Sequence, residues 1–382
     1  MSEISRPQAD AIVVSWLVAC YIATTCLVGP VAGLLIDLTT SRTCILLSGV
    51  VSLVGFSISS LAPDVSSLFL TLCVSSVGQG LSLVGSTVVL SVYFPTTTSI
   101  ANGILMCGVG LGSFFHPPIL QYLIDEYGLR GAFLIIGAIS FHSCLAGMLI
   151  KPHPTERKKA KISKKEDSVN RRTNQEFLSS VLGFVYVLRN PAFLMFLLCN
   201  ISNCMGFIIL IVYLPEYLIH IIHLDEQLTA RASSLVGIGV ASSRLLSGFI
   251  ANDAQIGHRV VYFGLNALTS LVCCFGPVIM THIDGGVYVF SIVFGLYAGG
   301  PIAMFVSITL DCLSEVDMSR GIGLCYMFGG VGYLLGPPLA ANIVQVVGYN
   351  GVLYLCAACY LFTVVAYSIS CVFSARKKAT RK

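Results

Sequence analysis

The stretch GLGSFFHPPILQYLIDEYGLRG (residues 110–131) returns 220 residues later as GVGYLLGPPLAANIVQVVGYNG (residues 330–351). The two stretches share glycine or proline at six equivalent positions, namely Gly110, Gly112, Pro117, Pro118, Gly128 and Gly131 against Gly330, Gly332, Pro337, Pro338, Gly348 and Gly351. Six matches of this kind at a single offset indicate that the chain consists of two duplicated halves.

The residues around both stretches are strongly apolar. Hydrophobic residues make up 55% of the 382-residue chain, charged residues only 10%, and the mean hydropathy is +0.86. A soluble domain carries about 25% charged residues, so lipid is the solvent that this composition requires. We predict an all-α integral membrane protein, because about 20 apolar residues cross a bilayer as a helix. Eleven spans are expected, at 11–36, 43–62, 67–92, 100–124, 131–150, 191–215, 232–251, 260–281, 285–310, 321–345 and 351–374.

Basic residues concentrate in the linker 151–190 and in the tail 376–382. If the tail is cytoplasmic, 18 of the 22 Lys and Arg residues lie on that side, as the positive-inside rule requires. The predicted domains are therefore an N-terminal bundle (1–150), a basic cytoplasmic linker (151–190), a C-terminal bundle (191–375) and a basic cytoplasmic tail (376–382). Five spans precede the linker and six follow it, which predicts an outward-facing N-terminus.

Several short motifs then follow one another in a recognisable order: Gly33-Leu-Leu-Ile-Asp37 with Arg42, Ala101-Asn102-Gly103, Tyr213-Leu214-Pro215, Gly237 through Arg244 to Gly248, and Gly336-Pro337-Pro338. Over nearly the whole chain this order resembles the monocarboxylate transporters of the major facilitator superfamily. The resemblance implies a two-bundle fold in which the first span is the family's second helix, so that the family's first helix has no counterpart.

Arg244 is the only Asp, Glu, Lys or Arg deep within a predicted span. An arginine at mid-bilayer costs at least ~2.5 kcal/mol, so it is expected to face a cavity, water or a partner. Its planar fork could bind a carboxylate, or it could bond to backbone carbonyls of a neighbouring helix. The resemblance favours the first, since this arginine matches one implicated in carboxylate binding.

Four further residues are candidates for substrate binding: Asn200, Asn203, Tyr297 and Gln79. Each polar one could instead form an interhelical hydrogen bond. Two turns carry similar charges, with Gly33, Asp37 and Arg42 in the first half and Gly248, Asp253 and Arg259 in the second. The resemblance implies that these turns act as a latch that breaks when the halves rock. The alternative is that their charges are simply solvated.

The leading functional prediction is secondary transport of monocarboxylates or related small organic metabolites by alternating access. Val240 occupies the position of an aspartate in proton-coupled members, and no lysine precedes Lys151. Standard proton coupling is therefore not expected, and the sequence leaves open whether protons are carried with the substrate. The alternative is a truncated, non-transporting form or a regulatory partner of a full-length carrier.

No motif for an enzyme, metal site or cofactor is evident in the sequence, and a nucleic-acid partner is not expected. The expected partners are a small organic anion and the lipid bilayer. The resemblance adds a single-span ancillary glycoprotein, as in some family members, and the plasma membrane as the location.

Overall fold

The structure, a computed structural model, describes residue 17 and residues 20–151, 182–253, 255–314 and 317–379. Within these ranges all regular structure is helical. Ten of the described helices are long and apolar enough to cross a membrane, and Thr98–Gly112 is a shorter apolar helix. The prediction of an all-α membrane protein is confirmed. The start of the first predicted span, most of the basic linker and the last three tail residues lie outside the described part.

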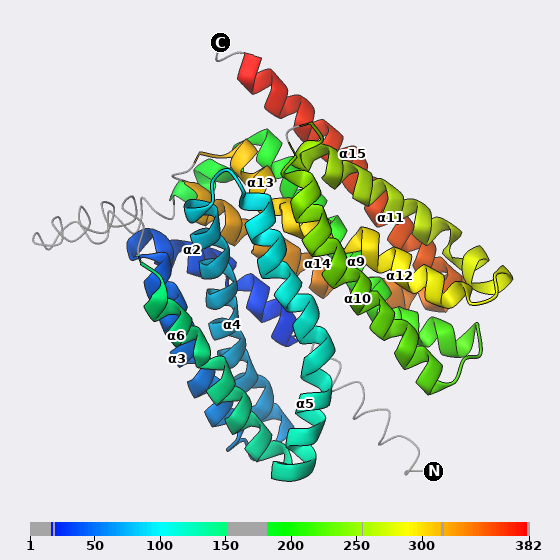
Figure 1. Ribbon diagram of the computed structural model, residues 1–382, viewed down its shortest axis with the longest axis horizontal. Helices are drawn as coiled ribbons and strands as arrows, with labels where there is room; N and C mark the ends of the chain where they lie inside the picture. Colours follow the sequence, from blue (N-terminus) through cyan, green and yellow to red (C-terminus); the bar gives the residue numbers. More distant parts are fainter. Residues whose placement is uncertain (1–16, 18–19, 152–181, 254, 315–316, 380–382) are drawn as a thin grey trace, which may run out of the picture.

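The helices form two bundles (Figure 1). The first bundle, here the N-half, contains α2 (Gly29–Leu38), α3 (Ser41–Ser59), α4 (Val65–Tyr93), α5 (Thr98–Ser140) and α6 (His142–Leu149), with a helical segment at 20–27 before α2. The second, the C-half, contains α9 (Pro191–His220), α10 (Glu226–Ala251), α11 (Gly257–His282), α12 (Gly286–Ala298), α13 (Pro301–Cys312), α14 (Met318–Val347) and α15 (Tyr349–Ala379).

Most of the described basic residues near helix ends lie at one end of the molecule. There α6 ends, α9 begins and α15 ends, along the left-hand side and the top of the view in Figure 1. Lys151 and Arg189 lie just after α6 and just before α9, and Arg42, Arg259 and Arg320 lie in the first turns of α3, α11 and α14, which begin at the same end. We call this the basic end and the opposite one the far end, where Arg130 and Arg231 lie.

The repeated stretches share a backbone feature. Gly128 has φ 68° and ψ 171°, and Gly348, 220 residues later, has φ 85° and ψ −178°. This combination of angles is open almost only to glycine. Each glycine turns the chain between two antiparallel helices at the far end. The predicted spans 100–124 and 131–150 therefore meet at Gly128 within α5, which continues into α6.

The predicted span 285–310 is interrupted in the structure. It forms α12 and α13, which are separated by Gly299 and Gly300. A Cβ on Gly299 would lie 2.7 Å from the Cα of Val240, so α10 packs directly against this break. Pro301 starts α13, where its missing N–H costs nothing.

The two halves touch through small residues near the basic end. Gly103 of α5 meets Gly248 of α10, and a Cβ added to either one would lie about 3.2 Å from the Cα of the other. On the opposite side a Cβ on Gly29, at the start of α2, would overlap the carbonyl oxygen of Gly323 in α14. Small residues allow such close approach between membrane helices.

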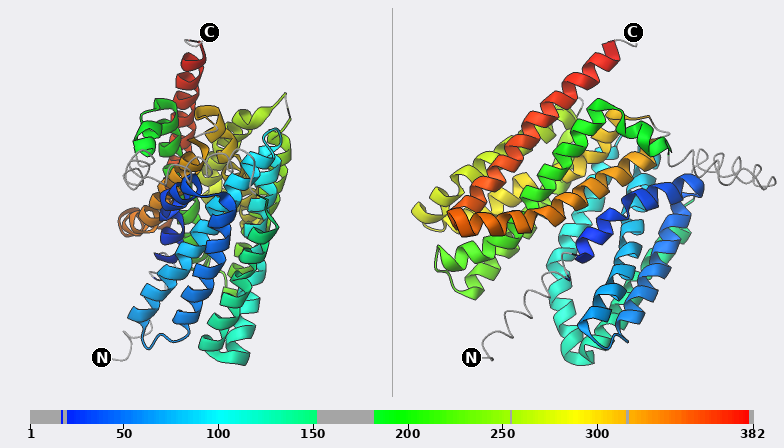
Figure 2. Two further views of the ribbon diagram at one scale, coloured as in Figure 1. Left: turned by 90° about the vertical axis from the view of Figure 1, so that its left-hand side faces the viewer. Right: turned by 180° about the vertical axis from the view of Figure 1, so that it is seen from behind.

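Toward the far end the halves separate. Gly110 of α5 still contacts Ala241 of α10, but a Cβ on Gly237, one turn farther along α10, would meet nothing within 4 Å. Figures 1 and 2 show α5 and α10 diverging from this level to the far end. The described arrangement is therefore closed at the basic end and spread at the far end.

Candidate functional site: a cavity between the halves

A cavity of about 130 Å³ lies between the two halves. Its lining comes from both bundles: Cys26, Leu83, Met106 and Val109 from the N-half, and Asn200, Cys204, Arg244, Ile302, Phe305, Cys325, Tyr326, Gly329 and Tyr333 from the C-half. An engineered cavity of about 150 Å³ in another protein holds benzene, so this cavity suits a molecule of roughly six non-hydrogen atoms.

Among the described residues of this lining Arg244 is the one that is formally charged, and only 6% of it is exposed. Its Nη1 donates to the carbonyl oxygen of Met106 in α5 at 3.0 Å. Its Nε has no hydrogen-bond partner among the described residues. One N–H of Arg244 therefore bonds the backbone of a neighbouring helix, as the second interpretation predicts, while its role in carboxylate binding stays a prediction.

The close crossing of α5 and α10 brings Arg244 to this position. Gly248 lies one turn beyond Arg244 and Ala241 about one turn before it, and both contact α5 directly. A Cβ on Gly103 would lie 2.7 Å from the Arg244 carbonyl oxygen. Arg244 is therefore held where the two backbones are closest, and its side chain can reach a carbonyl of the other half.

Of the two other predicted substrate-binding residues on α9, one lines the cavity and the other does not. Asn200 lines the cavity, and its Nδ2 donates to the Cys325 carbonyl. Asn203 points elsewhere and donates to Asn266 Oδ1 at 2.6 Å.

Gln79 and Tyr297 are not part of the described cavity lining either. Gln79 bonds Ser140 within the N-half, with Nε2 3.3 Å from Oγ. Tyr297 lies on α12, close to the break before α13. For Asn203 and Gln79 the geometry matches the interhelical hydrogen bond that was the alternative.

Two tyrosines of α14 were not predicted from the sequence. Tyr326 and Tyr333 both line the cavity. They are seven residues apart, which is two helical turns and therefore one face of α14. This spacing was the available signal, but it is weak beside the glycines and prolines of the repeat. Tyr326 also bonds across the halves to Thr87 at 3.0 Å and packs edge-on against Phe305, with ring centroids 5.1 Å apart.

The first charged turn does reach the other half, although through a different partner. Asp37 pairs with Arg320 of α14, with Oδ2 2.7 Å from Nε, and accepts a hydrogen bond from Ser319. Arg42, four residues past the end of α2, instead donates to the Met148 carbonyl at 3.4 Å. A Cβ on Gly33 would lie 2.7 Å from the Ser319 carbonyl oxygen, so this glycine lets α2 approach α14.

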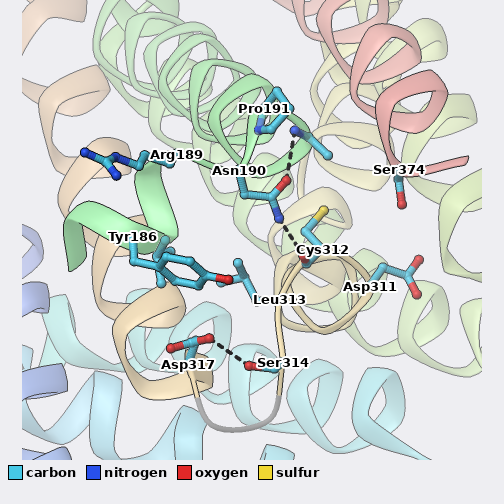
Figure 3. Close-up of a pocket in the computed structure, with 12 residues that line it drawn as sticks. Tyr186, Arg189, Asn190, Pro191, Asp311, Cys312, Leu313, Ser314, Asp317 and Ser374 are labelled. Atoms are coloured by element: carbon cyan, nitrogen blue, oxygen red, sulfur yellow. Dashed lines mark hydrogen bonds between the residues drawn. The ribbon is translucent and has the colours of Figure 1, made fainter. Parts of the chain in front are cut away.

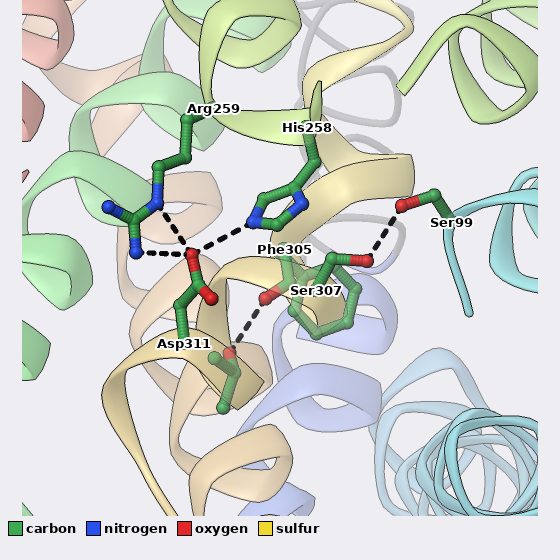
Figure 4. Close-up of polar contacts among 7 residues, drawn as sticks. Ser99, His258, Arg259, Phe305, Ser307 and Asp311 are labelled. Atoms are coloured by element: carbon green, nitrogen blue, oxygen red, sulfur yellow. Dashed lines mark hydrogen bonds and ion pairs between the residues drawn. The ribbon is translucent and has the colours of Figure 1, made fainter. Parts of the chain in front are cut away.

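The second charged turn makes its contact inside the C-half (Figure 4). Arg259 and His258 both donate to Asp311 at the end of α13, with Arg259 Nε 2.6 Å and His258 Nε2 2.9 Å from Oδ2. Asp253 accepts from the backbone N–H of Gln255 at 2.8 Å and is not an ion-pair partner of Arg259. On the same helix as Asp311, Ser307 bonds Ser99 of α5 at 2.8 Å. Helix α13 thus connects the second turn to the opposite half.

A second pocket, of about 350 Å³, opens at the basic end (Figure 3). Its lining lies within 186–192, 311–317 and Ser374, which all belong to the linker end or the C-half. Asn190 spans it, donating to the Cys312 carbonyl at 2.7 Å. Since no described residue of the N-half contributes to the lining, this pocket is less suited than the central cavity to a ligand passed between the halves.

Comparisons with known proteins agree with this architecture. The family model of the Major Facilitator Superfamily matches residues 4–255 and 196–382. Monocarboxylate transporter 2 of Meriones unguiculatus is 26% identical over 97% of this chain and 80% of its own length. Monocarboxylate transporter 6 of Homo sapiens is also 26% identical, over 98% of this chain and 75% of its own.

Solved structures show the same fold at low sequence identity. The human organic anion transporter MFSD10 superposes with a TM-score of 0.71 at 14% identity, covering 92% of this chain and 82% of its own. FucP in the outward conformation gives 0.71 at 12% identity, covering 93% and 89%. The predicted two-bundle fold of the major facilitator type is therefore confirmed.

Proposed function

The chain belongs to the major facilitator superfamily of membrane transporters, and we propose that it carries short organic anions of the monocarboxylate class by alternating access. The named relatives are monocarboxylate transporters, which favours a substrate with one carboxylate. We further propose that the basic end faces the cytoplasm, because Lys and Arg concentrate there, and, from the family resemblance, that the protein lies in the plasma membrane.

The observation that carries this proposal is Arg244 at the wall of the inter-half cavity. A buried guanidinium with an N–H left unpaired is costly, and a carboxylate supplies the acceptor that it lacks. The volume of about 130 Å³ leaves room for a short chain beside that carboxylate. Apolar neighbours such as Phe305, Met106 and Val109 can contact the alkyl part of the substrate.

Alternating access follows from where the halves are joined. Three polar contacts join the halves between the cavity and the basic end. They are formed by Asp37 with Arg320, by Ser99 with Ser307, and by Asn102 with the Ala303 carbonyl. In this state substrate would enter from the far end. Release at the basic end requires these contacts to break while the far ends of α5 and α10 approach each other.

Uptake into proteoliposomes containing the purified full chain tests the proposal. We expect Arg244→Ala and Arg244→Lys to lower the uptake of a short monocarboxylate roughly 10- to 100-fold, because charge-assisted hydrogen bonds are lost and lysine lacks the planar fork. Arg231→Ala is the matched control, since Arg231 is exposed on the same helix. Wild-type uptake in the Arg244 variants, with equal protein per vesicle, would remove this residue from the mechanism.

Coupling of substrate transport to protons can be measured in the same vesicles. Val240 packs into the core of the C-half at the position of the family's aspartate, so we propose that transport does not follow the standard proton symport. A pH-sensitive dye trapped inside should then report no substrate-driven acidification. Robust acidification would contradict this part of the proposal alone.

A further inference from the structure

A chain of polar contacts leads from an exposed serine at the basic end to the ion pair between the halves. Ser314 donates to Asp317 Oδ2 at 2.7 Å, and Asp317 Oδ1 accepts from Arg320 Nη1 at 3.1 Å. Arg320 Nε in turn lies 2.7 Å from Asp37 Oδ2 of the N-half. A change of charge at Ser314 can therefore act on the contact between the halves through two intervening residues.

Ser314 is the accessible end of this chain of contacts. It is exposed, whereas the side chains of Asp317, Arg320 and Asp37 are each at most 17% exposed. Ser314 follows α13 and belongs to no helix, and Leu313 before it has extended backbone angles, with φ −118° and ψ 166°. An enzyme can therefore reach the Ser314 hydroxyl without unfolding a helix.

The sequence after Ser314 is acidic. Ser314-Glu315-Val316-Asp317 places a carboxylate one residue and three residues beyond the hydroxyl. Protein kinases choose their substrates partly by such patterns of charge, and acidic residues in these places suit a serine kinase with a basic substrate groove. The proposed cytoplasmic orientation of the basic end places this serine on the side of the membrane where ATP is found.

We propose that Ser314 is a phosphorylation site for a serine kinase that recognises acidic residues, and that its phosphate loosens the basic end by drawing Arg320 away from Asp37. In the reaction Ser314 Oγ bonds to the γ-phosphorus of ATP, the bond from this phosphorus to ADP breaks, and the hydroxyl proton passes to the kinase. The proposal rests on the proposed orientation of the basic end and is independent of the substrate that the protein carries.

A phosphate is a stronger partner for Arg320 than Asp37 is. It carries a charge of about −1.5 to −2 and three acceptor oxygens, and the planar fork of an arginine can bind two of them at once. Arg320 Nε and Asp37 Oδ2 are close in space but lack the alignment of a hydrogen bond. The added charge also repels the Asp317 carboxylate, which frees Arg320 Nη1 for the phosphate.

The pocket of about 350 Å³ at the basic end offers room for the phosphate. Figure 3 shows the Ser314 hydroxyl and the Asp317 carboxylate together at this pocket, and both residues line it. Arg189 is exposed and lines the same pocket, so it can neutralise part of the added charge. The phosphate can thus stay beside α14 instead of extending into water.

Phosphorylation of the purified full chain tests the site. The chain is incubated with Mg²⁺, ATP and a serine kinase that recognises acidic residues, and phosphopeptides are identified by mass spectrometry. We expect phosphate on Ser314, and none at this position in Ser314→Ala. Ser67→Ala is the matched control, because Ser67 also donates to an aspartate three residues away, but Asp64 precedes it. This variant should keep the phosphate on Ser314. Absence of phosphate from Ser314 in the wild-type chain would overturn the proposal.

Hydrogen–deuterium exchange tests the effect on the halves. In the phosphorylated chain we expect exchange to be roughly 10-fold faster in the first turns of α5 and in α13, because a charge-assisted contact between the halves is lost. In Arg320→Ala the phosphate has no arginine to draw away, so phosphorylation should leave exchange in these segments unchanged. Equal exchange before and after phosphorylation of the wild-type chain, or the same acceleration in Arg320→Ala, would overturn the inference. Neither measurement involves uptake, so failure of this inference is distinguishable from failure of the proposed transport.

Discussion

At the scale of single residues, the ion pair between Asp37 and Arg320 joins the two halves. The side chains of both residues are largely shielded from solvent. Their side chains are 8% and 17% exposed. Arg320 also contacts Asp317 at 3.1 Å. A Cβ on Gly183 would overlap the Arg320 guanidinium, so the short helix 182–188 packs directly on the pair. Shielding makes such a pair costly to break from one side.

We therefore expect Arg320→Ala and Asp37→Asn to loosen the basic end. Hydrogen–deuterium exchange should rise in the first turns of α5 and in α13, because their contacts across the halves also close the basic end. Arg42→Ala is the control, because Arg42 makes one long hydrogen bond within its own half. Unchanged exchange in both segments would show that the pair does not hold the basic end closed.

The residues of the site differ in how far the sequence could reveal them. Arg244 could be predicted, since an isolated charge in an apolar span is informative without knowing its neighbours. The partner of Asp37 could not, because Arg320 is far away in the sequence and only the fold brings them together. Asn203 and Asn200 are both polar and three residues apart, yet the rotation of α9 directs one to Asn266 and the other to the cavity.

At the scale of helices, the crossing of α2 with α14 depends on having no side chain at Gly29 or Gly323. A Cβ on either would overlap the carbonyl oxygen of the other. Both neighbours are backbone atoms, which cannot rotate aside. The crossing therefore opens if either glycine gains a methyl group.

Gly29→Ala should destabilise the protein by about 1–3 kcal/mol, the usual cost of overpacking, and lower its melting temperature in detergent. Gly264→Ala in α11 is a matched control, since a Cβ there meets nothing within 4 Å. Alanine also favours helix by about 1 kcal/mol over glycine, so this control should be neutral or slightly stabilising. Equal melting temperatures for the two variants would mean that α2 and α14 do not need this close approach.

Hydropathy predicted the helices well and their interruptions poorly. A predicted span is defined by the mean hydropathy of about 20 residues, and this mean is high in apolar membrane helices. Glycine and proline barely change this average. The break at Gly299 and Gly300 thus stayed invisible inside the predicted span 285–310, although α10 packs against it. The turn at Gly128 lies between the predicted spans 100–124 and 131–150, where the charged residues Asp125, Glu126 and Arg130 lower the hydropathy.

At the scale of the whole molecule, the duplicated halves enclose a site that neither could form alone. The cavity takes its charged residue from α10 and the carbonyl partner of that residue from α5. The polar contacts that close the basic end likewise join the N-half to the C-half. Under the proposed mechanism, rocking of one half against the other would therefore change access to the cavity without dismantling either bundle.

A reversible cross-link tests this motion. Ser99 and Ser307 have hydroxyl oxygens 2.8 Å apart across the halves, so Ser99→Cys combined with Ser307→Cys places two sulfurs within reach of a bond of about 2.05 Å. Oxidation should stop uptake by holding the basic end closed, and a reductant should restore it. Each single variant is the control for the native cysteines, and peptide mass spectrometry verifies the new disulfide. If vesicles with the disulfide fully formed still accumulate substrate at the wild-type rate, the basic end is not the exit, and the halves do not work by rocking apart there.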